Sequence, residues 1–269
     1  MKALIISLIV IFALIEVTLI ISLCLYFRIF YNNLKGKKEA LEPLKGKLYV
    51  PFEEQSRNLI SEALAIPFEQ VYIEPKKGRK LAGRYYFNSD SAPTAIMIHG
   101  YKSVGIKDFS GGIQDLLARG HNVLIVDHYG HYLSGGKTIT FGVNEKYDLM
   151  SWIDYVNKRN NNPTIYLYGI SMGGATVLMA SGLDLPSNVK GIIADCPYAS
   201  VTQEIKDTVE RMKIPFWLVH PFIYLAALIF ARFDMKKGEA KDYIEKTNLP
   251  ILIIHGSTDD IVYVDSSRK

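Results

Sequence analysis

The stretch YLYGISMGGAT, residues 166–176, places a serine between two glycines directly after an apolar run. Its centre, GISMG at 169–173, matches the G-x-S-x-G pattern, in which a strand turns sharply into a helix and presents the serine hydroxyl. Glycines suit such a turn because the crowded backbone leaves no room for a β-carbon. The pattern predicts that Ser171 is a nucleophile for acyl transfer, and an ordinary glycine-rich turn is the alternative.

Two further stretches place polar residues at the ends of apolar runs. IHGY, residues 98–101, closes one run, and IIHGSTDDIV, residues 253–262, contains the end of the last one. Because ligands bind at the carboxyl ends of parallel strands, we expect both stretches to lie near the serine. A nucleophilic serine works with a base that an acid orients, and the residues alone leave Asp259 and Asp260 as candidates for that acid.

From about residue 70 onward, segments with the character of strands alternate with segments with the character of helices. The later strand candidates are short and continuously apolar, as expected for strands covered on both faces. Helices are predicted at 109–118, 143–159 and 172–183, the first of them ending at Gly120. The alternation predicts an α/β fold with a mostly parallel sheet and helices on both faces. The expected strands are 69–74, 80–87, 94–98, 122–127, 164–168, 190–195 and 249–254.

Composition excludes several classes of function. The chain has 269 residues and a net charge of +4, without a basic stripe of interleaved aromatic residues, so nucleic-acid binding is not predicted. Its two cysteines, Cys24 and Cys196, belong to no CxxC or Cys/His cluster, so no metal is expected. No motif suggests an organic cofactor either. The expected ligand is a small acyl or peptide substrate.

An apolar segment opens the chain, and Glu16 is the single charged residue within its span of 3–27. As a helix of about 1.5 Å per residue it crosses a hydrocarbon core of roughly 30 Å. It is longer than the ~7–15-residue core of a signal peptide, so a retained single-pass membrane anchor is predicted over a cleaved signal. Arg28 and the lysines after it outnumber Lys2, which favours a cytoplasmic catalytic domain, with the opposite orientation as the alternative.

These features divide the chain into an anchor at 1–32, a polar juxtamembrane linker at 33–67 and an α/β domain at 68–269. Residues 201–247 interrupt the alternation of that domain with an amphipathic stretch, an apolar run and a charged segment. We interpret them as a lid-like insertion over the carboxyl edge of the sheet. A second membrane contact is the alternative, although the apolar run at 222–231 is too short to span a bilayer.

The motifs resemble the α/β-hydrolase family, and above all the bacterial membrane-anchored serine hydrolases of its serine-aminopeptidase-like branch. The resemblance covers roughly 68–269 and is carried by IMIHGY, VDHYGHYLSGGKT, YGISMGGAT, IADCPYAS and IIHGSTDDIV. It implies a Ser–His–Asp triad that uses Ser171 and, at the family's HG-x-x-D position, Asp259. It also implies an oxyanion hole formed by the backbone N–H groups of Tyr101 and Met172.

The histidine of that triad is the unmatched part. The family order is serine, acid and then histidine, yet no histidine follows Asp259 in this sequence. His99 and His255 end strands, and His128 and His131 lie in a loop, so none of these is predicted to be the base. The sequence therefore predicts a chain shortened at its carboxyl end relative to the family, with weak or no activity in this form.

The predicted function is that of a serine hydrolase that cleaves carboxylic esters or related acyl substrates through an acyl-enzyme on Ser171. Phe216, Trp217 and Phe222 in the insertion favour an apolar substrate. A serine peptidase or aminopeptidase of the same fold is one alternative. A catalytically inactive, membrane-tethered binding protein is the other, and the unmatched histidine favours it.

Overall fold

In the part of the chain that the structure describes, seven strands form one sheet in the order β1-β2-β4-β3-β5-β6-β7. The computed structural model describes residues 1–269 except 34–35, 37, 44–45, 47–48, 162 and 269. The pairs β1–β2 and β2–β4 are antiparallel, and the remaining neighbours are parallel, which confirms the predicted mostly parallel sheet. The strands are β1 Glu69–Ile73, β2 Leu81–Tyr86, β3 Thr94–Ile98, β4 Asn122–Asp127, β5 Ile165–Ile170, β6 Val189–Asp195 and β7 Ile251–Ile254.

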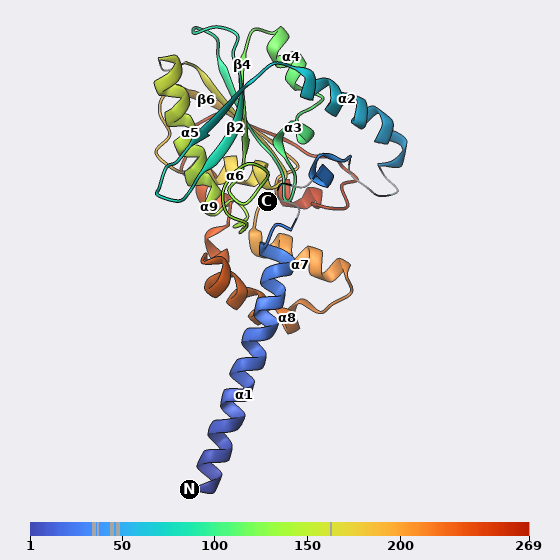
Figure 1. Ribbon diagram of the computed structural model, residues 1–269, viewed down its shortest axis with the longest axis vertical. Coiled ribbons are helices and arrows are strands. Elements are labelled where there is room, and N and C mark those ends of the chain that lie inside the picture. Colours follow the sequence, from blue (N-terminus) through green and yellow to red (C-terminus); the bar gives the residue numbers. More distant parts are fainter. Residues whose placement is uncertain (34–35, 37, 44–45, 47–48, 162, 269) are drawn as a thin grey trace.

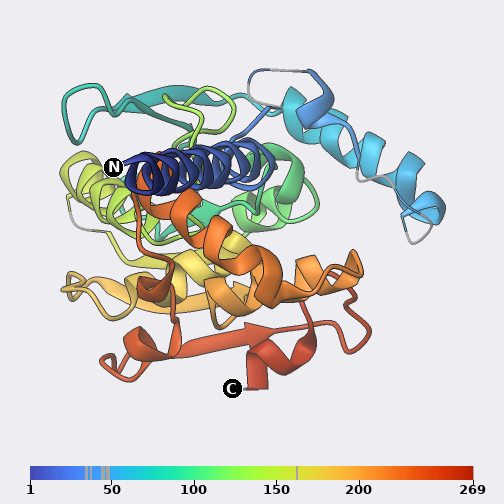
Figure 2. The same ribbon diagram turned by 90° about the horizontal axis from the view of Figure 1, so that it is seen from below.

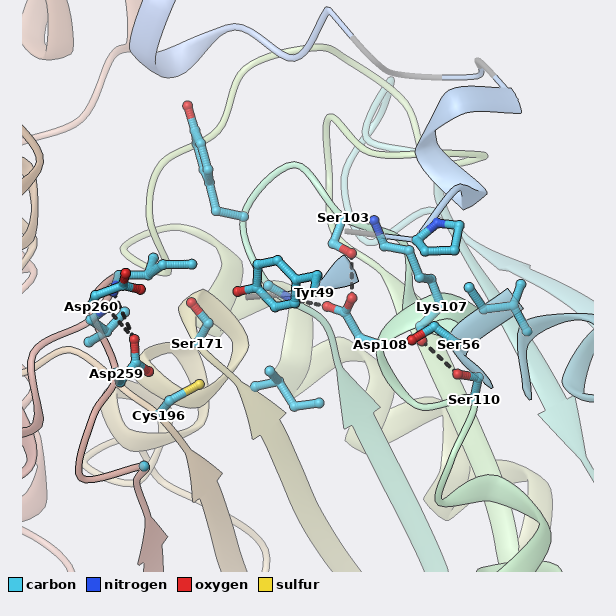
Figure 3. A pocket seen from close by; sticks show the side chains of 18 of the residues that line it. Tyr49, Ser56, Ser103, Lys107, Asp108, Ser110, Ser171, Cys196, Asp259 and Asp260 are labelled. Carbon is cyan, nitrogen blue, oxygen red and sulfur yellow. Dashed lines mark hydrogen bonds between the residues drawn. The ribbon is translucent and has the colours of Figure 1, made fainter. Parts of the chain in front are cut away.

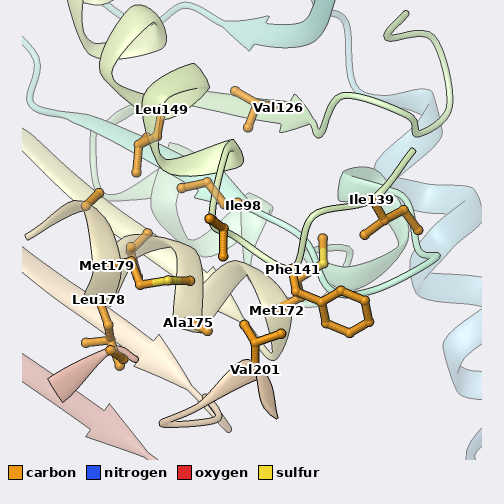
Figure 4. Packing of buried hydrophobic residues seen from close by; sticks show 14 of the residues in the cluster. Ile98, Val126, Ile139, Phe141, Leu149, Met172, Ala175, Leu178, Met179 and Val201 are labelled. Atoms are coloured by element: carbon orange, nitrogen blue, oxygen red, sulfur yellow. The ribbon is translucent and has the colours of Figure 1, made fainter. Parts of the chain in front are cut away.

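Helices cover both faces of the sheet, so the central strands are buried on each side (Figure 1). Strand β3 illustrates why its sequence is continuously apolar. Ile96 and Ile98 join the hydrophobic cluster that contains α5 and α6, whereas Ala95 and Met97 join the cluster that contains α3 and α4. Figure 4 shows part of the first cluster. The helices on these faces are α3 Gly105–Asp108, α4 Ile113–Ala118, α5 Glu145–Asn160 and α6 Met172–Ala180, and α2 Glu53–Ala65 lies beside α3 and extends away from the sheet.

Two expectations about the helices need correction or addition. The helix predicted at 109–118 is partly wrong, because α4 begins only at Ile113, after the pair Gly111 and Gly112, and glycine is a poor helix former. Gly120 has the positive φ of +82° expected just past a helix end. The segment interpreted as a linker contains α2, which buries Ala63 against the second cluster.

The inserted segment forms three α-helices, one π-helical turn and one 3-10 turn. Helix α8 continues into a π-helical turn, η4, and Figure 1 shows α7 and α8 at the end of the sheet from which the N-terminal helix projects. Pro221 lies inside α8 without ending it. The elements are α7 Val201–Arg211, α8 Phe216–Leu225, η4 Ala226–Ala231, η5 Met235–Lys237 and α9 Lys241–Ile244.

The N-terminal helix α1, Lys2–Leu25, continues through the π-helical turn η1, Tyr26–Phe30. Among the described residues, this helical stretch is the only one long and apolar enough to cross a membrane, judged by length and composition. Its far end is docked on the domain. Phe30 is fully buried, with its ring 5.8 Å from that of Phe141 and 5.4 Å from that of Phe233. The carbonyl of Phe30 accepts a hydrogen bond from the N–H of Ile139 at 2.7 Å.

We expect Phe30→Ala to lower the free energy of unfolding by about 3–5 kcal/mol, because it removes a fully buried aromatic ring and leaves a cavity. Phe12→Ala is the matched control, since the Phe12 ring is 62% exposed on the same helical stretch. Denaturant titration in detergent micelles measures both variants. Equal small effects would show that the end of α1 is not docked on the domain.

Candidate active site

Ser171 occupies a strained turn between β5 and α6. Its backbone angles are φ 53° and ψ −114°, a conformation that costs a non-glycine residue of order 1–3 kcal/mol. The surrounding backbone holds the turn in place. The N–H of Ser171 donates to the carbonyl of Asp195 at 2.8 Å, and the N–H of Ala175 donates to the carbonyl of Ser171 at 2.9 Å. The turn projects the serine hydroxyl away from the sheet (Figure 3).

The glycines that flank Ser171 are required by close backbone contacts. A β-carbon at Gly173 would lie 1.9 Å from the carbonyl oxygen of Ile98, and one at Gly169 would lie 2.1 Å from the carbonyl oxygen of Gly173. These contacts press the first turn of α6 against the ends of β3 and β5. The sequence argument for glycine at both positions is therefore confirmed by the geometry.

The loop after β3 lies beside the serine. A β-carbon built on Gly100 would be 3.4 Å from the Ser171 β-carbon. The next residue, Tyr101, lines the same cavity as Ser171. Asp108 holds this loop, because its carboxylate accepts hydrogen bonds from the N–H of Gly100 at 2.8 Å and from the Ser103 hydroxyl. Tyr101 and Met172, the predicted oxyanion donors, thus belong to the two segments that flank Ser171. No local pattern in the sequence signals the positioning role of Asp108.

Three of the histidines form a buried cluster behind this loop. The His99 and His128 ring centroids are 4.7 Å apart, and those of His99 and His131 are 4.8 Å apart. The Nε2 atom of His99 accepts from the N–H of His128 at 3.1 Å, and Nε2 of His131 accepts from the N–H of Lys102 at 3.2 Å. Burial lowers the pKa of both His99 and His128, which favours neutral rings. The cluster therefore supports the loop structurally.

Asp259 and Asp260 differ in their surroundings. The Asp259 carboxylate accepts from the N–H groups of Ile261 at 2.9 Å and Val262 at 3.0 Å, and its other oxygen lies 3.5 Å from Nε2 of His255. Asp260 is exposed to solvent. Both residues line the cavity that contains Ser171. The fixed orientation of Asp259 favours it over Asp260 as an acid group of the site.

His255 is occupied by other groups. Its Nδ1 atom lies 2.5 Å from the Ser267 hydroxyl and its Nε2 atom 2.8 Å from the carbonyl oxygen of Val262. The Ser171 hydroxyl has no hydrogen-bond partner within the part of the chain that the structure describes. No histidine there is in position to accept its proton directly.

Cys196 is another nucleophilic side chain that lines this cavity. Burial and the neighbouring Asp195 raise the pKa of its thiol to about 12. Because the thiolate is the reactive form, Cys196 is a poor nucleophile at neutral pH. Ser171 is therefore the better nucleophile candidate of the two.

Ser171 lies at the boundary of two cavities. The larger, of about 720 Å³, also contains Tyr49, Lys107, Asp108 and Asp259 (Figure 3). The smaller, of about 460 Å³, extends from Ser171 beneath the insertion and is lined mainly by apolar side chains. A reacting carbonyl at Ser171 would thus have room for a polar group on one side and an apolar group on the other. No motif in the residues around Ser171 predicts that the site is divided into these two cavities.

The parallel sheet, the strained serine turn and the loop after β3 together define the α/β-hydrolase fold. Residues 91–230 match the family described as Serine aminopeptidase, S33. The chain belongs to this family, and it is therefore a member of a hydrolase family.

Relatives and solved structures agree with this assignment. The chain is 29% identical over 209 residues to the uncharacterized protein YqkD of Bacillus subtilis, covering 75% of this chain and 68% of YqkD. It is 26% identical to the uncharacterized protein YfhR of Escherichia coli K12, of which it covers 66%. An esterase of Pyrococcus furiosus, Pf2001, superposes with a TM-score of 0.60 at 24% identity, covering 77% of each chain. Est1E of Butyrivibrio proteoclasticus, with ferulic acid bound, superposes with a TM-score of 0.59 at 25% identity, covering 74% of this chain and 83% of Est1E.

We expect Gly173→Ala to destabilise the protein by more than about 3 kcal/mol, because its methyl group would overlap the Ile98 carbonyl oxygen and the backbone would have to move. Gly112→Ala is the control, since its added methyl group meets no atom within 4 Å. Thermal unfolding of both variants measures the difference. A Gly173→Ala protein as stable as the Gly112→Ala protein would contradict the described packing of the turn.

Glu204 gives a pH-dependent prediction. Burial raises its pKa to about 7, and its Oε2 atom is buried without a hydrogen-bond partner in the described structure. The neutral carboxyl stabilises the fold fully below the unfolded pKa, and this contribution is lost as the pH rises through about 7. As the pH rises from 4.5 to 8, the wild type should therefore lose about 2–3 kcal/mol of unfolding free energy that Glu204→Gln retains. The exposed Glu210→Gln on the same helix is the control, and an unchanged stability difference across this range would refute the burial of Glu204.

Proposed function

We propose that the protein is a serine hydrolase that cleaves carboxylic esters or related acyl substrates through an acyl-enzyme on Ser171. One observation carries the proposal: a strained turn, held by backbone contacts, presents the Ser171 hydroxyl to both cavities. The loop around Gly100 and the start of α6 flank the serine, which supports Tyr101 and Met172 as donors to an oxyanion.

The proposed reaction proceeds in two steps. The Ser171 oxygen bonds to the substrate carbonyl carbon and gives its proton to solvent water, the ester C–O bond breaks, and the alcohol leaves after it takes up a proton from water. A water oxygen then bonds to the acyl carbon and the bond from that carbon to the Ser171 oxygen breaks, so the carboxylic acid leaves and a proton of the water passes to the Ser171 oxygen. Asp259 is the proposed acid, whose role in a triad is to orient a histidine base. Because no histidine within the described residues forms a hydrogen bond with the Ser171 hydroxyl, we expect slow turnover by this chain.

Esters are preferred over peptides as substrates because the smaller cavity is mainly apolar. The solved esterases Pf2001 and Est1E, which share the fold, add support for this preference. A serine peptidase or aminopeptidase is the nearest alternative, since the matched family carries that description. Release of fatty acid from esters, compared with release of amino acids from aminoacyl substrates, separates the two activities.

We further propose that α1 anchors the protein in a membrane, with the catalytic domain on the cytoplasmic side. The length and apolar character of residues Lys2–Phe30 support the anchor. The excess of positive residues after the helix supports the orientation. Substrate would then reach the site at the membrane surface.

A membrane-tethered binding protein without catalytic activity is the second candidate function. The Ser171 hydroxyl has no hydrogen-bond partner among the described residues, which favours this candidate because a serine without a base is a weak nucleophile. Such a protein would use the same two cavities to hold an acyl ligand without cleaving it.

A fluorophosphonate probe distinguishes the two candidates. We expect slow, stoichiometric labelling of the wild-type chain and no labelling of Ser171→Ala, because the probe reacts with a nucleophilic serine at an oxyanion site. Ser110→Ala is the matched control, since the Ser110 hydroxyl lines the same cavity but donates to the carbonyl of Lys107 at 2.9 Å. Labelling that survives in Ser171→Ala would place the nucleophile elsewhere, and no labelling of wild type would favour the binding protein.

A further inference from the structure

Ser171, helices α7 and α8 of the insertion and the junction of α1 with η1 all contribute to the lining of the smaller cavity. At about 460 Å³ it falls in the roughly 300–1,000 Å³ range of small-molecule sites. Apolar lining residues come from the two helices and from the junction: Leu25, Ile29, Ile205, Val209, Val219 and Ile223. The N-terminal helix is therefore part of the site itself.

One face of α1 explains this arrangement. Residues 2–17 are exposed throughout, and the partly or fully buried positions after them recur every one to four residues along one side of the helical stretch: Thr18, Ser22, Leu25, Tyr26, Ile29 and Phe30. The last turns of the helix are thus seated on the domain, and the earlier turns are available to lipid. Two hydrogen bonds link the seated end to the active-site loop, from the Tyr101 hydroxyl to the carbonyl of Ile29 at 2.6 Å and from Lys102 Nζ to the carbonyl of Arg28 at 3.2 Å.

The insertion lies beside the same helix. Figures 1 and 2 show α8 and η4 along α1, and the Tyr26 and Phe230 rings are 6.0 Å apart. Trp217 is 76% exposed and Leu218 is 52% exposed, so this part of the insertion presents large apolar side chains to its surroundings. Next to a membrane-spanning helix, such side chains suit contact with the bilayer interface.

We propose that the smaller cavity, here named the acyl cavity, holds the hydrocarbon chain of a membrane lipid ester that enters from the bilayer between α1 and the insertion. This proposal rests on the proposed function of Ser171. The ester carbonyl lies at Ser171, and the alcohol part of the lipid lies in the larger cavity, whose lining includes the polar groups of Ser103, Lys107 and Asp108. Attack by Ser171 transfers the acyl chain to its oxygen and releases the alcohol, and water then releases the fatty acid.

A lipid substrate accounts for the walls of the cavity better than a soluble ester does. A soluble substrate needs no contact with the proposed membrane anchor, yet Leu25 and Ile29 of that helical stretch line the same cavity as Ser171. The hydrocarbon chain of a lipid that moves from the bilayer into the acyl cavity exchanges one apolar environment for another. Its transfer therefore avoids exposing methylene groups to water.

Photocrosslinking tests occupancy without chemistry. The Ser171→Ala chain, reconstituted in phosphatidylcholine vesicles, is irradiated with a phosphatidylcholine that carries a diazirine near the end of one acyl chain, and the adducts are mapped by mass spectrometry. We expect adducts on Ile205 or Val209, inside the acyl cavity. Adducts confined to the exposed residues of α1 and α8 would overturn the proposal.

Chain-length selectivity tests the same cavity in the wild-type background. Val219→Trp should narrow the cavity and slow labelling by hexadecyl fluorophosphonate about tenfold or more, with less than about a twofold change for ethyl fluorophosphonate. Leu218→Trp is the matched control, because the neighbouring Leu218 is exposed and does not line the cavity. Equal slowing of both probes by Val219→Trp would overturn the proposal. Absence of Ser171 labelling by either probe, with adducts still present in the cavity, would instead refute the hydrolase function and retain the lipid site.

Discussion

The close approach of α6 to the ends of β3 and β5 is the constraint on which the site depends. The backbone of Gly173 touches the carbonyl of Ile98 so closely that no β-carbon fits between them. This contact forces the chain to turn at Ser171 with a positive φ, and it brings the loop around Gly100 beside the serine. The strain at Ser171 persists because the packed strands and helix leave the turn no relaxed alternative.

A second set of contacts joins the N-terminal helix to this turn. Phe30 packs between Phe141 and Phe233, and the Tyr101 hydroxyl binds the carbonyl of Ile29. The ring of Tyr101 also stacks on that of Phe141, with centroids 5.1 Å apart. The proposed membrane anchor, the active-site loop and the insertion therefore form one continuous structure. In the proposed function, this continuity places the serine close to the bilayer surface.

The sequence was sufficient to predict the elements that depend on local pattern. Continuous apolar runs marked strands such as β3 and β4 at their observed bounds, and the glycines around Ser171 marked the turn. The predicted start of the helix at 109–118 was wrong, because the helix begins at Ile113, after two glycines that disfavour helix formation. The roles of Ser171 and Asp259 remain predictions, because the fold and the family are what the comparisons establish.

Features that depend on contacts between distant residues were not predictable from the sequence. Asp108 holds the loop at Gly100, and His99, His128 and His131 pack together behind that loop, although nothing in their spacing announces either role. The division of the site into two cavities likewise arises only when the insertion folds beside α1. Such features follow from tertiary packing, which local propensity does not encode.

The most direct measurement is an acid-quenched acyl-enzyme trap, in which the full chain in vesicles is incubated with a long-chain acyl ester and its peptides are mapped by mass spectrometry. Our account predicts that the acyl group is found on the peptide that contains Ser171 and that it disappears on longer incubation with water alone. An acyl group on Cys196 or Ser103 instead, with none on Ser171, would contradict it.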